Sequence, residues 1–152
     1  MTTVLLKGEE LEVARAEVEA VRAAVDGGDY ADLLDDLLAI LVDGSELEER
    51  HAGELDRLLT LALQSGRVRA LYGPGGEQAA LRAFRKLPTG AELSESAAAV
   101  NDALAALDGR AIGRLSLTAV GPGSFTLAVA TDGPQLSIRL DRQGARVTSV
   151  EV

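Results

Sequence analysis

The chain has 152 residues, of which 47% are hydrophobic, and a net charge of −9. A chain of this length buries enough surface to fold without disulfides or a structural metal. It has no cysteine and one histidine, His51, so thiolate nucleophiles and thiolate metal sites are excluded. No catalytic or cofactor motif stands out. The sequence favours a protein that is not an enzyme, with catalysis left open only as part of ligand binding, and we expect neither cofactor nor metal.

The sequence carries no export or membrane signal that we recognise. The opening residues lack a basic segment followed by a long apolar stretch. No apolar run approaches the roughly 18 residues of a membrane-spanning helix. We therefore expect a cytoplasmic protein with no membrane partner. The abundance of Arg, Ala, Leu, Gly and Val is typical of a GC-rich bacterium.

Charge is distributed unevenly along the chain. Residues 1–66 carry 5 basic and 16 acidic side chains, whereas residues 67–88 carry five basic side chains and only one acidic one. An acidic protein repels nucleic acid at long range, and binding would depend on the short basic stretch. We do not expect nucleic acid as a partner.

An apolar stripe with helical spacing opens the chain. It predicts a helix over about residues 9–26, ended by two glycines. Such a stripe either packs inside the monomer or pairs with the same helix of a second copy. Its members are Leu11, Ala14, Val18, Val21 and Val25.

Two more helices are predicted before residue 66. The first covers about 29–43, with Asp29 as N-cap and a broad leucine face. The second covers about 45–65, where Ser45 and Glu48 have the spacing of a capping box. Asp32, Asp36 and Asp43 lie opposite the leucine face, and helical phase separates Asp35 from them. The pattern indicates a solvated side of the helix rather than a cation site.

The middle of the chain is interrupted by glycine and proline. Residues 67–72 fit either a helical turn or a short strand, and we favour the helix. Residues 73–76 should break the chain before a helix over 77–87. Residues 88–90 should break it again before an alanine-rich helix over about 93–107.

The C-terminal segment alternates apolar and polar residues, which is the pattern of half-buried strands. Turn residues separate these strands, and the short connections predict an antiparallel meander. The strands are expected at 114–119, 125–129, 136–140 and 146–152. We therefore predict one α+β domain over 1–152, in which about five helices within residues 1–109 pack on one face of a four-stranded β-meander formed by residues 110–152.

A glycine-rich stretch between basic residues is the first candidate binding site. Backbone N–H groups at the start of the following helix, with nearby arginines, would hold a phosphate or carboxylate. The stretch lacks the residues of a P-loop or a dinucleotide site, and it also fits a simple tight turn. The candidate ligand residues are Arg67, Arg69, Tyr72, Gly73, Gly75, Gly76, Arg82, Arg85 and His51.

His51 lies on or beside the apolar face of the third predicted helix, one turn after Glu48. A general base oriented by a carboxylate has this spacing, and so does a histidine at the edge of the core. No Ser, Cys or second metal ligand is linked to it by spacing.

The outward face of the predicted sheet is the second candidate surface. Small polar residues and arginines dominate it, as in many protein interfaces, although a solvated face also fits. Its members are Arg114, Ser116, Thr118, Thr126, Ser137, Arg139, Arg146 and Thr148.

Two functions follow. The first is a protein-interaction component, an adaptor or assembly factor that forms a homodimer or binds another protein. The alternative is a domain that binds a small anionic ligand in a pocket between helices and sheet.

Overall fold

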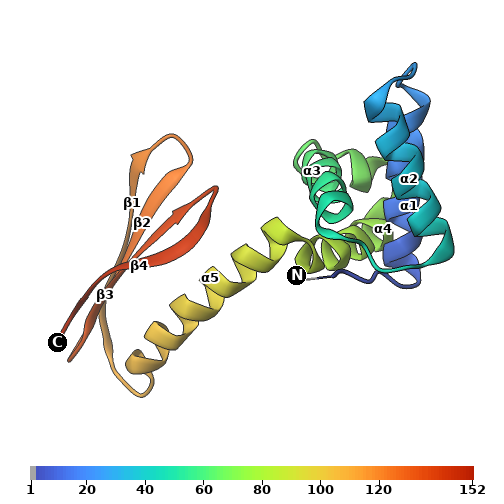
Figure 1. The fold of residues 1–152 in the computed structure, drawn as a ribbon. Coiled ribbons are helices and arrows are strands. Elements are labelled where there is room, and N and C mark those ends of the chain that lie inside the picture. Colours follow the sequence, from blue (N-terminus) through green and yellow to red (C-terminus); the bar gives the residue numbers. More distant parts are fainter. Residues whose placement is uncertain (1–2) are drawn as a thin grey trace. The chain divides into compact units, whose positions relative to one another are not determined.

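A computed structural model describes residues 3–152. The chain divides into two compact units, residues 1–91 and 92–152, which are described separately below (Figure 1). Helices come first and a four-stranded antiparallel sheet follows, so the predicted α+β class is confirmed.

The helices are α1 (Glu9–Ala23), α2 (Asp29–Asp43), α3 (Glu49–Gln64), α4 (Arg67–Lys86) and α5 (Pro88–Leu104), followed by the short 3-10 helix η1 (Ala105–Leu107). The strands are β1 (Ile112–Gly121), β2 (Ser124–Thr131), β3 (Gln135–Asp141) and β4 (Gly144–Glu151).

The apolar stripe of α1 packs inside the helical unit. Ala14 and Val18 are fully buried, and the other three members of the stripe lie partly buried against the same core. Leucines of α2 and α3 complete this core. The most completely buried of them are Leu34, Leu37, Leu41, Leu55 and Leu59. The stripe is therefore occupied by packing within the chain.

The predicted start of the third helix is wrong. α3 begins at Glu49, and no side chain caps it. Leu47 instead forms an antiparallel bridge with Val4, in which the Leu47 N–H donates to the Val4 carbonyl at 2.7 Å. Because Leu47 is also buried, this pairing outweighs a capping box at Ser45. At α2 the N-cap is Gly28 rather than Asp29.

Residues 67–72 are helical, as the sequence favoured. Within α4 only Gly73 leaves the helical conformation, with φ 69° and ψ −173°, and this positive φ is accessible because glycine has no Cβ. The helix continues from Pro74. A proline is tolerated in a first turn because an N–H at that position would have no acceptor within the helix. The break is thus a kink at one residue.

The expected break between α4 and α5 lies at Leu87, whose backbone is extended, and its predicted position at residues 88–90 is wrong because α5 begins at Pro88. The carboxylate of Asp56 in α3 accepts hydrogen bonds from the Thr89 backbone N–H at 3.1 Å and from the Thr89 hydroxyl at 2.6 Å. Asp56 therefore supplies, from another helix, an acceptor for the first turn of α5.

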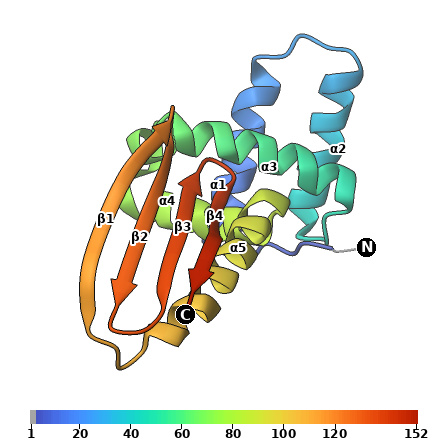
Figure 2. The same ribbon diagram turned by 90° about the vertical axis from the view of Figure 1, so that its left-hand side faces the viewer.

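The second unit is an antiparallel meander in the order β1-β2-β3-β4, and the predicted strands are confirmed (Figure 2). Its register places Leu117 opposite Leu127, Leu127 opposite Ile138, and Ile138 opposite Val147. One face of the sheet is therefore apolar across all four strands. The helical residues that cover it come from the end of α5 and from η1: Val100, Ala103, Leu104 and Leu107.

Candidate functional site

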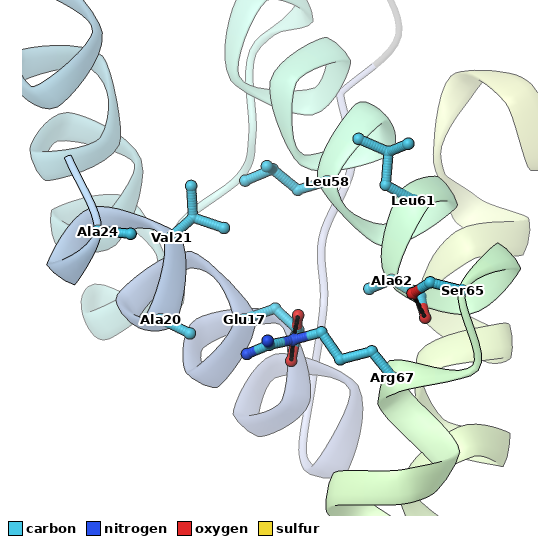
Figure 3. A pocket seen from close by; sticks show the side chains of 9 residues that line it. All are labelled: Glu17, Ala20, Val21, Ala24, Leu58, Leu61, Ala62, Ser65 and Arg67. Carbon is cyan, nitrogen blue, oxygen red and sulfur yellow. Dashed lines mark hydrogen bonds and ion pairs between the residues drawn. The ribbon is translucent and has the colours of Figure 1, made fainter.

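A groove in the helical unit lies between α1 and α3 (Figure 3). Its volume is about 420 Å³, and its walls are largely aliphatic. The α1 wall is formed by Glu17, Ala20, Val21 and Ala24, and the α3 side by Leu58, Leu61, Ala62 and Ser65. Both sets have the spacing of one helix face, so two helices present parallel stripes to the same hollow. Arg67 lies at its end.

A buried carboxylate organises the end of this groove. The Glu17 side chain is only 3% exposed. Its Oε2 accepts from Arg67 Nε at 3.1 Å, and its Oε1 accepts from the Tyr72 hydroxyl at 2.8 Å. A buried carboxylate needs such partners, because removing it from water is costly without them. Glu17 thus holds Arg67 and Tyr72 in place.

Burial and the hydrogen bond to Glu17 raise the pKa of Tyr72 to about 12. The neutral phenol is favoured in the folded state, so the free energy of unfolding should fall as pH rises from about 10 toward about 12. A near-ultraviolet absorbance titration, in a chain with only two tyrosines, should show this late step. Burial and the hydrogen bond to Glu54 also raise the pKa of Tyr30, so the steps are assigned by comparing variants. The amplitude near pH 12 should be lost in Tyr72→Phe and kept in Tyr30→Phe; an unchanged amplitude there in Tyr72→Phe would contradict the assignment.

The other predicted ligand residues are largely engaged with acidic side chains. Arg82 lies 3.4 Å from Glu9 and 3.9 Å from Glu10, and Arg69 lies 4.0 Å from Glu77. Arg85 donates to the Leu81 carbonyl of its own helix. The basic stretch of the sequence therefore meets acids within the helical unit, mainly those of α1.

The glycine-rich stretch, residues 73–76, lies beside carboxylates rather than beside free basic side chains. A hollow of about 340 Å³ beside Gly75 and Gly76 is also lined by Glu9, Glu12 and Tyr72. Two carboxylates repel an incoming phosphate. The anion site at this stretch stays a prediction, and its surroundings do not favour it.

His51 lies on α3 with both ring nitrogens buried. Among the described residues neither nitrogen has a hydrogen-bond partner, so no contact to Glu48 orients the ring. A general base needs an orienting group and a route to substrate. The geometry around His51 provides no such arrangement in residues 3–152.

The sheet unit exposes much of its apolar face. Leu115 and Leu117 of β1 are 59% and 62% exposed, although they lie on the face that carries the core residues of β2 and β3. We call the exposed part of this face the open strip; it comprises Ile112, Leu115, Leu117, Phe125, Leu140 and Val150.

The open strip has a geometric cause. A helix with its side chains is about 10–12 Å across, whereas four strands at about 4.8 Å spacing make a wider surface. The residues packed with α5 and η1 come from β2, β3 and β4, and none belongs to β1. One helix therefore cannot cover the outermost strand.

The polar face of the sheet largely matches the prediction. The register puts Arg114, Ser116, Thr118, Thr126, Ser137, Arg139 and Arg146 on one side. Thr148 is the extra residue at a register shift in β4, and its hydroxyl donates to the Ser137 carbonyl at 3.3 Å. Arg146 pairs with Asp141 at 2.8 Å. A shallow hollow of about 360 Å³ lies on this face beside Arg114 and Gln135.

The described residues contain no group of three or more potential metal ligands. No helix among residues 3–152 is long and apolar enough to cross a membrane. Comparison with protein-family models, with curated proteins and with solved structures found no match.

Sequence reasoning missed Glu17 and the open strip. Glu17 is three residues after Ala14 and four before Val21, so helical spacing places it on the apolar stripe, and this was the available signal. Alternation identified Leu115 and Leu117 as inward-facing, but it could not show that the covering helix stops short of them.

Proposed function

We propose that the protein is a homodimeric interaction component, an adaptor or assembly factor, whose sheet unit pairs with the sheet unit of a second copy. The open strip is the observation that carries the proposal. Ile112, Leu115 and Leu117 follow one another along β1, and such a run of exposed apolar side chains on a sheet is an interaction surface or an aggregation hazard unless something covers it. A cytoplasmic location, expected from the sequence, belongs to the same proposal.

The apolar area of the open strip sets the strength of the dimer that we expect. Covering six half-exposed apolar side chains on each of two copies contributes roughly 10 kcal/mol. Association itself costs about 4–15 kcal/mol. The surplus is about 6 kcal/mol at most. We therefore expect a weak dimer whose dissociation constant is roughly tens of micromolar or higher.

Charge favours a second copy on the sheet unit. Residues 92–152 carry five basic and seven acidic side chains, a net charge of −2, whereas residues 1–91 carry 10 basic and 17 acidic ones, a net charge of −7. Repulsion between identical units is therefore small at the sheet. The six strip residues carry no charge, so two copies related by a two-fold axis match each other.

Sedimentation equilibrium over a range of concentrations tests the proposal. The wild-type mass should rise from 15.8 kDa toward twice that value. Leu117→Glu should stay monomeric, because a carboxylate in an apolar interface loses its water without gaining a partner.

Thr118→Glu is the matched control, since Thr118 is the next residue of β1 and lies on the polar face. It should dimerise like the wild type. If Thr118→Glu dissociates the dimer and Leu117→Glu does not, the interface belongs to the polar face. If the wild type remains monomeric at high concentration, the proposed function fails.

A further inference from the structure

We propose that the groove between α1 and α3 is a binding site for a small amphipathic carboxylate, whose aliphatic chain lies in the groove and whose headgroup pairs with Arg67. This site is separate from the open strip and does not depend on dimerisation.

The groove has the composition of a small-molecule site. Ligand sites usually have volumes of about 300–1,000 Å³, apolar walls and a few placed polar groups. Here the volume is about 420 Å³, and six of the nine lining residues are Ala, Val or Leu. Each wall spans about two helical turns, roughly 10 Å, which suits a short aliphatic chain. The sticks in Figure 3 converge on this space from both helices.

Arg67 is positioned to receive an anion. Glu17 engages the Nε side of the guanidinium, at 3.1 and 3.4 Å. The two terminal nitrogens of Arg67 have no hydrogen-bond partner among the described residues, and the side chain is 48% exposed. Guanidinium binds a carboxylate in a bidentate manner through two such N–H groups. Glu17 fixes one side and leaves the other free.

The sign of the ligand charge follows from exposure. Glu17 is the only acid lining the groove, and its side chain is enclosed and already bonded by Arg67 and Tyr72. Arg67 is the only charged lining group that solvent reaches substantially among the described residues. The charged groups described at this end of the groove therefore offer a ligand N–H donors and no free carboxylate oxygen, which favours a carboxylate over an ammonium.

A small ligand fits better than a partner helix. The groove is only about two helical turns long. One end of the groove is occupied by Arg67, which Glu17 holds in place, and no row of charged side chains from the described residues lines the groove.

Octanoate titrated into the isotope-labelled full chain and followed by NMR tests the proposal. The expected result is saturable shifts at the methyl groups of Ala20, Val21 and Leu58. Octylammonium and octanol should bind at least about tenfold more weakly, since they lose the charge-assisted pair.

Two variants make the assignment specific. Arg67→Gln keeps a donor for Glu17 but should weaken octanoate binding about tenfold, whereas Arg69→Gln, the neighbouring arginine of α4, should not change it. Ala20→Leu should block the groove while preserving helix propensity.

Several results would overturn the site. They are unchanged binding in Arg67→Gln, an equal loss in Arg69→Gln, equal binding of octanol, shifts confined to the sheet unit, and no binding of octanoate at all. None of them affects the dimer proposal, because the open strip and the groove share no residue.

Discussion

Gly90→Ala is expected to destabilise the helical unit by about 3 kcal/mol. An added Cβ would overlap the carbonyl oxygen of Phe84 and lie 2.6 Å from its carbonyl carbon and 2.7 Å from the Arg85 Cα. These atoms are backbone at the end of α4, so no side-chain rotation relieves the clash. The start of α5 would have to move away from α4.

Tyrosine fluorescence during urea unfolding measures this effect. Tyr30 and Tyr72 both belong to residues 1–91, and the chain has no tryptophan, so the signal reports the helical unit. Gly53→Ala is the matched control: it lies in α3 with nothing within 4 Å of an added Cβ, and it should raise stability by about 0.5–1 kcal/mol. Equal effects at the two glycines would contradict the close approach at Gly90.

Leu59→Ala should cost the helical unit about 3–4 kcal/mol. Leu59 is fully buried in the core formed with α1 and α2, and truncation removes apolar contacts and leaves a cavity. Urea unfolding read by tyrosine fluorescence again measures the loss.

Leu61→Ala, in the same helix, provides the comparison. Leu61 is 54% exposed at the groove, and its truncation should cost less than about 1 kcal/mol. If the two leucines cost the same, the assignment of the core face of α3 is wrong. A second, tyrosine-silent transition by circular dichroism should remain unchanged in Leu59→Ala, since the sheet has its own core.

Some of the candidate site was readable from the sequence. The basic stretch and Tyr72 were predicted to bind an anionic ligand. In the structure several of these side chains contact carboxylates of the chain itself, most of them from α1, which lies far earlier in the chain. Arg67 meets Glu17 and Arg82 meets Glu9. The spacing of residues within one segment cannot show which distant segment its charged side chains will contact.

The sequence by itself determined the element types, because apolar spacing of three and four or of two reports which side of a helix or strand is buried, and this depends on neighbouring residues alone. Only the tertiary structure decided the start of α3, the start of α5 and the exposure of β1. Leu47 pairs with Val4, Asp56 accepts hydrogen bonds from Thr89, and one helix is too narrow to cover four strands. Each of these outcomes depends on residues far apart in the chain, whose meeting is settled by packing.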